Sequence, residues 1–538
     1  MTLRLYGPGD LDRLDPVAAR PDAAQLVRLV SRQLLSYAPR RDLREWQSVL
    51  PAPDVALDVP STYNAGLGAS QRSYVVHLRR DVYWDTSPPR PVTAHDFVRG
   101  FKRLANPLTR SPALPFFRST VRGFAEFCDG FANARPTSAE AAAAYQNAHE
   151  ISGIFALDDE SLVIEVVRAS PDFVHMLALP CTSAVPQEHD AHLPGSPDLT
   201  PRLCSNGPYR VGRHVPGKEL RLEPNPVWSP DADPVRRRPI DAVVVTRADT
   251  DAGEVAARLD AGGADLPWGI ALSGEGAAPA AALSWDLDPY LVFNLTTGSD
   301  ALRDVAVRRG ITAAIDRDAL ARTFATAGCR AASGVVPPNN DGHRPPSADD
   351  RGTGGDLGGL TLTGVHERCG PHALVARACA DQLARVGVQV RLFALDRPDL
   401  DELVRDPHGS AAPRWDVMWH RCCAAWHYRN GRVFLEQMFA SGAPGNLGGW
   451  SDEKTDALVE RALEAAVEAP AVATAAWHEV ERHVLEQAVV VPLLFRPPAV
   501  PPRSSARVRD AVPMPALGYA CDITAIRVAD AALEEVSA

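Results

Sequence analysis

Residues 360–392 read LTLTGVHERCGPHALVARACADQLARVGVQVRL, and this stretch decides the fold class. Short runs of apolar and β-branched residues predict strands over 360–363 and 388–392. The residues between them predict a helix over 372–386 that ends at Gly387, since glycine commonly follows the last turn of a helix. A strand, a helix and a second strand in this order predict a β-α-β unit with two parallel strands.

Strands and helices alternate along most of the chain. Strands are predicted by alternation or by β-branched runs at residues 3–6, 73–79, 161–167, 240–246, 291–294, 416–419 and 489–495. Helices are predicted at residues 24–35, 93–104, 139–145, 305–325, 453–467 and 472–487. Thr93 is expected to cap its helix, and Asp96 suits the positive end of that helix's dipole. The alternation over residues 160–320 and 360–420 predicts two α/β lobes with a ligand cleft between them.

Composition limits the possible functions. The 538 residues suffice for three or four domain-sized units. A net charge of −11 and a pI near 5.8 argue against nucleic-acid binding, which requires clustered positive charge. The longest basic run, Arg236 to Arg238, is predicted to be a solvated turn. The glycine-rich stretch 351–359 is predicted to be a linker, because it lacks the Gly-Lys-Ser/Thr of a phosphate loop.

The N-terminus bears on the expected location of the protein. It shows no basic segment, apolar segment or small-residue cleavage site of a secretory signal. No run reaches the roughly 18 apolar residues of a membrane span. We therefore expect a cytoplasmic protein as the sequence stands, or an extracytoplasmic one if a signal was removed or lies upstream. Nine cysteines without a CxxC pair favour a reducing compartment.

Several segments resemble, in the same order, the landmarks of one known family. The strongest is residues 74–84 (YVVHLRRDVYW) followed by residues 91–97 (PVTAHDF). Further segments lie at residues 14–16, 50–56, 205–211, 290–294, 307–317, 376–390 and 490–494. Together they resemble family 5 of the solute-binding proteins of ABC transporters, typified by oligopeptide- and dipeptide-binding proteins. The resemblance spans nearly the whole chain.

The resemblance implies a periplasmic-binding-protein-like α/β fold of type II, with two lobes, a central ligand cleft and an extra subdomain. The implied first lobe comprises residues 1–45, 165–265 and 489–538. The extra subdomain comprises residues 46–164, and the second lobe residues 266–488. The implied function is capture of a peptide-like or other small organic solute by hinge closure. The implied partner is an ABC permease, if the protein is exported, and the expected state is a monomer without a cofactor.

One segment departs from the family pattern. Peptide-binding members are expected to hold the ligand's α-ammonium with an aspartate, because a buried ammonium needs a carboxylate partner. The corresponding segment 419–435 (WHRCCAAWHYRNGRVFL) contains no carboxylate, and either Cys422 or His427 stands at the aspartate's position. An anionic or aromatic solute is therefore a candidate ligand. The candidate polar contacts are His427 and Arg429, and the candidate aromatic walls are Trp419, Trp426, Tyr428 and, near the lobe crossover, Trp268.

The same departure leaves an alternative function open. An intracellular enzyme or solute-handling protein with this fold would use Cys422, Cys423 and His427 as its reactive group. A metal site made of His420 and these three residues is not expected, because adjacent cysteines rarely both bind one ion. A DNA-binding sensor is not expected either, because no helix-turn-helix fits before residue 45.

Overall fold

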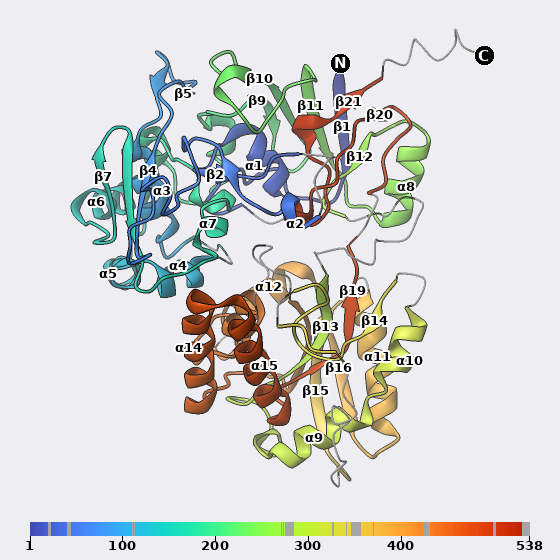
Figure 1. The fold of residues 1–538 in the computed structure, drawn as a ribbon. Helices are drawn as coiled ribbons and strands as arrows, with labels where there is room; N and C mark the ends of the chain where they lie inside the picture. The colour runs from blue at the N-terminus through green and yellow to red at the C-terminus, as the bar shows by residue number, and fades with distance from the viewer. Residues whose placement is uncertain are drawn as a thin grey trace. The chain divides into compact units, whose positions relative to one another are not determined.

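The computed structural model forms two compact units (Figure 1). Unit 1 comprises Met1–Pro279 and Ala499–Ala538, and unit 2 comprises Ala280–Pro498. The structure describes residues 1–529 except 20–22, 40–44, 110, 112, 271, 273, 275–284, 325–327, 341, 346–356, 369–370, 411, 423–425, 427–430 and 499–501. Each unit contains its own sheet with helices packed against it, so the α/β class predicted from the sequence is confirmed.

Unit 1 has a mixed five-stranded sheet in the order β12-β1-β11-β10-β9. Strand β1 (Thr2–Gly7) pairs in parallel with β11 (Ala242–Arg247) and with β12 (Leu266–Pro267). Strand β10 (Glu219–Pro224) runs antiparallel to β11 and pairs with β9 (Tyr209–Val215). Alternate strand residues are fully buried in one apolar core, and they include Leu3, Leu5, Leu220, Leu222, Val243 and Val245.

A second, three-stranded sheet of unit 1 has the order β4-β8-β7. The antiparallel strands β4 (Ser73–His77), β8 (Ser161–Glu165) and β7 (Ile154–Asp158) lie beside helix α3 (Ala94–Leu104). The prediction that residues 46–164 form a separate subdomain stays a prediction.

The hydrogen bonds at the start of α3 explain the roles of Thr93 and Asp96 in the segment PVTAHDF. Thr93 is the N-cap, as predicted, and its backbone N–H donates to Oδ2 of Asp96 at 3.0 Å. The indole Nε1 of Trp84 donates to the same oxygen at 3.0 Å. Asp96 therefore fixes both the beginning of the helix and the neighbouring aromatic side chain.

The remaining helices and strands of unit 1 are short or lie around these two sheets. They are α1 (Ala24–Val30), β2 (Leu35–Ser36), α2 (Glu45–Ser48), β3 (Ala52–Pro53), β5 (Tyr83–Trp84), β6 (Arg90–Pro91), α4 (Leu114–Thr120), α5 (Phe124–Ala134), α6 (Ala139–Ala148), α7 (Phe173–Met176), α8 (Ala252–Asp260), β20 (Val508–Arg509) and β21 (Arg527–Val528).

Unit 2 contains the predicted β-α-β unit. Strand β15 (Thr361–Glu367) pairs in parallel with β16 (Gln389–Leu395), and helix α11 (Pro371–Ala384) connects them. Gly387 follows the helix with a φ of 83°, a left-handed conformation that glycine adopts without strain. Strand β17 (Val417–Cys422) pairs in parallel with the other side of β15. The β-α-β prediction is confirmed.

The other half of this sheet is antiparallel. Strand β13 (Asp286–Phe293) pairs with β17 and also with β18 (Val490–Pro492) and β19 (Leu494–Arg496). Strand β14 (Arg330–Ala331) pairs with β19 at the edge. Strands β18 and β19 thus belong to unit 2, and the chain leaves this unit after Pro498, whereas the sequence placed the boundary at residue 489.

Helices cover both faces of the unit 2 sheet (Figure 1). Leu291, Phe293 and Trp419 face a core formed with one group of helices: α9 (Val305–Ala314), α10 (Arg317–Thr323) and α11. The opposite face carries α14 (Glu453–Glu468) and α15 (Pro470–Glu486). Helices α12 (Arg397–Arg405) and α13 (Arg432–Phe439) complete this unit.

One predicted helix is interrupted. The sequence predicts a helix over 305–325, but α9 ends at Ala314 and α10 begins at Arg317. Asp316 causes the break, because its side chain accepts a hydrogen bond from the N–H of Ala319 at 2.9 Å and caps the new helix. The predicted helix over 24–35 likewise ends early, at Val30.

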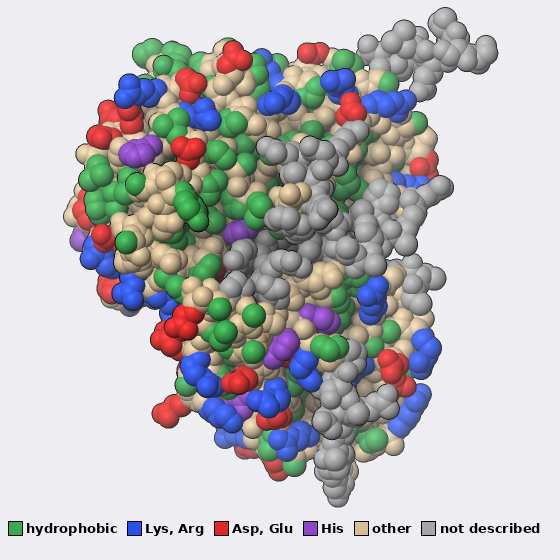
Figure 2. Space-filling view, in the orientation of Figure 1, with side chains coloured by type: hydrophobic (Ala, Val, Ile, Leu, Met, Phe, Trp, Pro, Cys, Tyr) green, Lys and Arg blue, Asp and Glu red, His purple; other side chains and the backbone are tan. Residues whose placement is uncertain are grey.

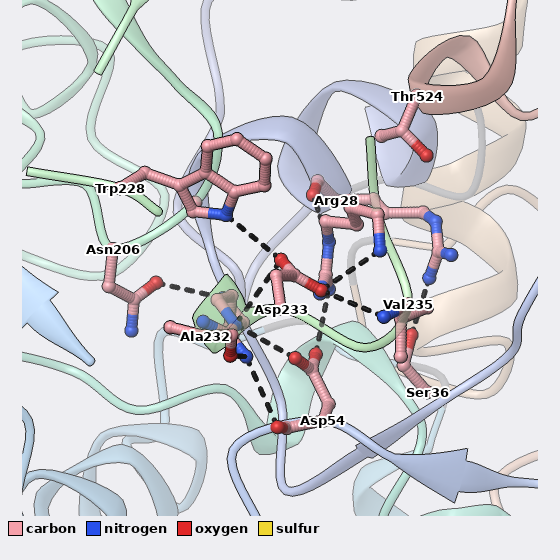
Figure 3. Close-up of polar contacts among 12 residues, drawn as sticks. Arg28, Ser36, Asp54, Asn206, Trp228, Ala232, Asp233, Val235 and Thr524 are labelled. Carbon is pink, nitrogen blue, oxygen red and sulfur yellow. Dashed lines mark hydrogen bonds and ion pairs between the residues drawn. The ribbon is translucent and has the colours of Figure 1, made fainter. Parts of the chain in front are cut away.

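The prediction of a solvated turn at Arg236 is wrong. Its side chain is completely buried, and one of its nitrogens lies 2.8 Å from Oδ2 of Asp54 (Figure 3). Nε of Arg32 donates to the other oxygen of Asp54, also at 2.8 Å. The network contains three arginines and three aspartates, which are Arg28, Arg32, Arg236, Asp54, Asp233 and Asp522. Because these charges balance, the network can be buried.

The surface and the helices add two observations. On the face shown in Figure 2, basic and acidic side chains are interspersed over the described part of both units. Among the described residues, no helix combines the length and the apolar character that a membrane crossing requires.

Candidate ligand-binding edge of unit 2

The parallel strands of unit 2 end at one edge of the sheet. Strands β15, β16 and β17 end at Glu367, Leu395 and Cys422. The antiparallel strand β13 begins at this edge with Asp286, which is paired with Arg496 at the end of β19. We call this region the carboxyl edge of unit 2. In open α/β sheets, ligands bind outside the carboxyl ends of the parallel strands, so this edge is the candidate site.

Asp288 is the most buried carboxylate at the carboxyl edge. Its Oδ1 lies 2.5 Å from Nε2 of His372, in the first turn of α11. Its Oδ2 lies 2.5 Å from the Arg496 guanidinium. Burial alone would raise the pKa of Asp288, but the hydrogen bond from His372 and the charge of Arg496 together lower it to about 2. Asp288 is therefore ionised at neutral pH, with a partner on each oxygen.

A second group of charges lies where β15 ends and α12 begins. Arg397, the first residue of α12, lies 3.3 Å from Oε2 of Glu367 and donates through Nε to Asp401 at 2.9 Å. Its guanidinium therefore pairs with two carboxylates. Arg368 and Asp396 form a more exposed pair beside this group at 2.7 Å.

His420 is the neutral polar side chain of this edge. It lies on β17 opposite Tyr290, with the two ring centroids 6.2 Å apart in an edge-to-face arrangement. Burial, together with the nearby positive charges of His372, Arg421 and Arg397, lowers the pKa of His420 to about 3. Its Nδ1 is buried and has no hydrogen-bond partner among the described residues. A neutral imidazole with a spare nitrogen can donate to or accept from a ligand, according to its tautomer.

Comparison with known proteins identifies the family. Residues 68–415 match the model of the bacterial extracellular solute-binding proteins, family 5. The chain belongs to this family. The resemblance predicted from the sequence is therefore confirmed.

Two curated relatives of this family 5 protein and two solved structures similar to it are informative. The chain is 26% identical over 276 residues to the periplasmic oligopeptide-binding protein OppA of Salmonella typhimurium, a match that covers 50% of this chain and 47% of OppA. It is 23% identical over 449 residues to the probable deoxycholate-binding periplasmic protein YgiS of Escherichia coli, which covers 79% of this chain and 77% of YgiS. The first match thus spans only about half of the relative's length.

The first similar solved structure is that of the clavulanic acid biosynthesis oligopeptide binding protein 2. It superposes with a TM-score of 0.76 and 25% identity, covering 98% of this chain and 96% of the other. Together with the similar fold of the murein tripeptide binding protein MppA of Escherichia coli, at a TM-score of 0.74, this likeness confirms the predicted type II binding-protein fold.

Two of the predicted aromatic contacts of this family 5 protein lie in apolar cores. Trp419 is fully buried on the face of β17 opposite His420, so close to Gly364 that a methyl group there would lie 2.8 Å from its ring. Trp268 follows β12 in unit 1 and packs against Gly9, with its backbone N–H donating to the Tyr6 carbonyl at 2.9 Å. Their role as ligand contacts stays a prediction.

Trp426 is also buried, and its surroundings are polar on one side. The Arg432 guanidinium lies 5.9 Å from the centre of its ring, and Nε of Arg432 donates to Glu436 at 2.6 Å. The other predicted residues of this segment, Cys423, His427, Tyr428 and Arg429, lie outside the described residues, so their roles stay predictions.

The structure also bears on the enzyme alternative. Burial and the charge of Asp286 raise the pKa of the Cys422 thiol to about 12. The thiol is therefore protonated at neutral pH, whereas a nucleophilic cysteine must form a thiolate. Among the described residues, no three His, Cys, Asp or Glu side chains are grouped so as to hold a metal ion.

Sequence reasoning did not single out Asp288, His372, Glu367 or Arg397. The signal that could have found two of them is their position: Glu367 follows the predicted strand 360–363, and His372 begins the predicted helix that comes next. The carboxyl-end rule applied to the β-α-β unit would have selected both.

Proposed function

We propose that this family 5 protein captures a peptide-like or other small organic solute and delivers it to an ABC permease. The observation that carries the proposal is the structural match over 98% of the chain to an oligopeptide binding protein, combined with the family match. The relatives named above bind oligopeptides or, for YgiS, are expected to bind deoxycholate, so both peptides and other organic acids are candidate ligands. Hinge closure around the solute is part of the proposal.

The carboxyl edge of unit 2 supplies the proposed ligand contacts. His420 and Tyr290 present a neutral imidazole and an aromatic ring, and Arg397 and Arg421 supply positive charge nearby. We also propose that the residues predicted from the sequence contact the ligand. They are His427, Arg429, Tyr428, Trp426, Trp419 and Trp268.

The family supports a proposal for the place of action and for the partner. Both relatives carry the word periplasmic in their names, and we propose that this protein also works outside the cytoplasmic membrane, as a monomer. Its proposed partner is an ABC permease.

Thermal unfolding with defined pools of short peptides and bile acids tests the proposal. A ligand present at 100 times its dissociation constant stabilises the folded protein by about 2.7 kcal/mol, which raises the melting temperature measurably. We expect at least one pool to raise it in proportion to the logarithm of concentration. An unchanged melting temperature with every pool and with small-molecule extract of the host would contradict solute capture.

A further inference from the structure

The partly or fully buried carboxylates described at the carboxyl edge of unit 2 are all paired with cations. Asp288 is held by His372 and Arg496 at 2.5 Å each. Glu367 lies 3.3 Å from Arg397, which also binds Asp401. The remaining acid, Asp286, lies 3.4 Å from Arg496. Each of these acids is therefore already paired, in the way that a ligand ammonium would otherwise pair with it.

The sequence that follows this edge adds no carboxylate. Residues 417–435 contain neither Asp nor Glu, although they contain Arg421, Arg429 and Arg432. The two flanking acids are also engaged within unit 2. The carboxylate of Asp416 accepts two backbone N–H groups at 2.7 Å, and Glu436 is paired with Arg432 at 2.6 Å.

These pairings decide which charge a ligand can present here. An ammonium that loses its water at this edge needs a carboxylate in exchange. Taking Glu367 or Asp288 for that purpose would weaken its ion pair with Arg397 or Arg496. Each of these cations would then keep only its second and more exposed partner, Asp401 or Asp286. A neutral group meets no such cost, and His420 has a spare nitrogen that can bind it.

We infer that the solute captured by this protein is peptide-like but lacks a free α-ammonium at the end that contacts unit 2, as in a peptide with an acylated amino end. This inference rests on the proposed function and narrows its ligand class.

The test compares two matched ligand pools. One pool contains random peptides of three to five residues, and the other contains the same peptides after acetylation of the amino end. Each pool is mixed with the full protein, and retained masses and dissociation constants are measured by native mass spectrometry and calorimetry. We expect acetylated peptides to bind at least tenfold more tightly than their free counterparts.

A variant adds a second readout. Arg397→Met removes the cation that pairs with Glu367, so we expect the preference for acetylated peptides to fall at least threefold. Arg368→Met breaks the exposed pair with Asp396 and serves as the matched control, with an unchanged preference. An unchanged preference in the Arg397 variant would overturn the role given to Glu367.

The outcomes separate the inference from the proposed function. Equal binding of the two pools, or tighter binding of free peptides, would overturn the inference and leave solute capture standing. Binding of neither pool would overturn peptide capture itself, and the inference with it.

Discussion

His420 is a side chain of the carboxyl edge whose charge state depends on folding. In the folded protein its pKa is about 3, whereas an exposed histidine has a pKa near 6.5. Between these values the unfolded chain binds a proton that the folded chain does not. Lowering the pH through this range therefore favours unfolding, and the stabilisation by the neutral form is fully present above pH 6.5.

The residue-scale prediction is that His420→Gln weakens this pH dependence. Unfolding free energies measured in urea from pH 7 to pH 4 should fall less in the variant than in the parent protein, because one group that resists protonation is gone. His95→Gln is the control, since His95 is 66% exposed and paired with an exposed aspartate. Identical pH profiles of the His420 variant and the parent protein would show that His420 is not held neutral.

The candidate site was predictable from the sequence only in part. The segment 419–435 attracted attention because its composition departs from the family pattern, and it does begin at the carboxyl edge. The pair of Asp288 and His372 was not found, because the two residues are 84 positions apart and only the sheet brings them together. Trp419 was chosen for its aromatic ring, although the alternation along β17 turns it away from His420 and into the core.

At the scale of elements, the buried charge network holds four segments of unit 1 together (Figure 3). Asp54, which follows β3, binds Arg32 after α1 and Arg236 in the loop after Trp228. Arg28 in α1 binds Asp522 near the end of the chain at 3.0 Å. Burial alone would raise the pKa of Asp233, but the charges of Arg236 and Arg32 hold it well below its usual range. Asp233 is therefore ionised throughout the neutral range.

The element-scale prediction is that Asp54→Asn strongly destabilises the protein. Removing the charge leaves two buried arginines with one acid fewer, and breaking such a pair costs about 3–5 kcal/mol of unfolding free energy. Glu160→Gln is the matched control: it breaks an exposed pair with Arg80, and we expect a loss below about 1 kcal/mol. Denaturant unfolding measures both, and equal losses in the two variants would contradict the stabilising role of the network.

Secondary structure was predictable at the level of elements because the periodic patterns are strong. Each strand and helix expected from the sequence overlaps one in the structure. The errors have identifiable physical causes. Asp316 caps a new helix inside the expected one, and Arg236 was assigned to solvent because its acidic partners lie far away in the sequence. The apolar periodicity of a segment reveals neither a side chain that caps a new helix nor an ion pair with a distant residue.

At the scale of the whole molecule, two separate units share one chain that leaves unit 1 before residue 280 and returns after residue 498. Order along the chain, rather than any single motif, carried the family assignment from the sequence, because the resembling segments follow one another in the family's order. Residues 417–435 contain no Asp or Glu, and the prediction that this bears on the ligand stays a prediction.

The central claim is that the protein binds a solute without changing it. Native mass spectrometry of the full protein mixed with small-molecule extract of its own host tests this claim most directly. We expect one solute to be retained and released with unchanged mass. A solute that disappears while a new mass accumulates in solution would contradict it, and would make Cys422, Cys423 and His427 the first residues to substitute.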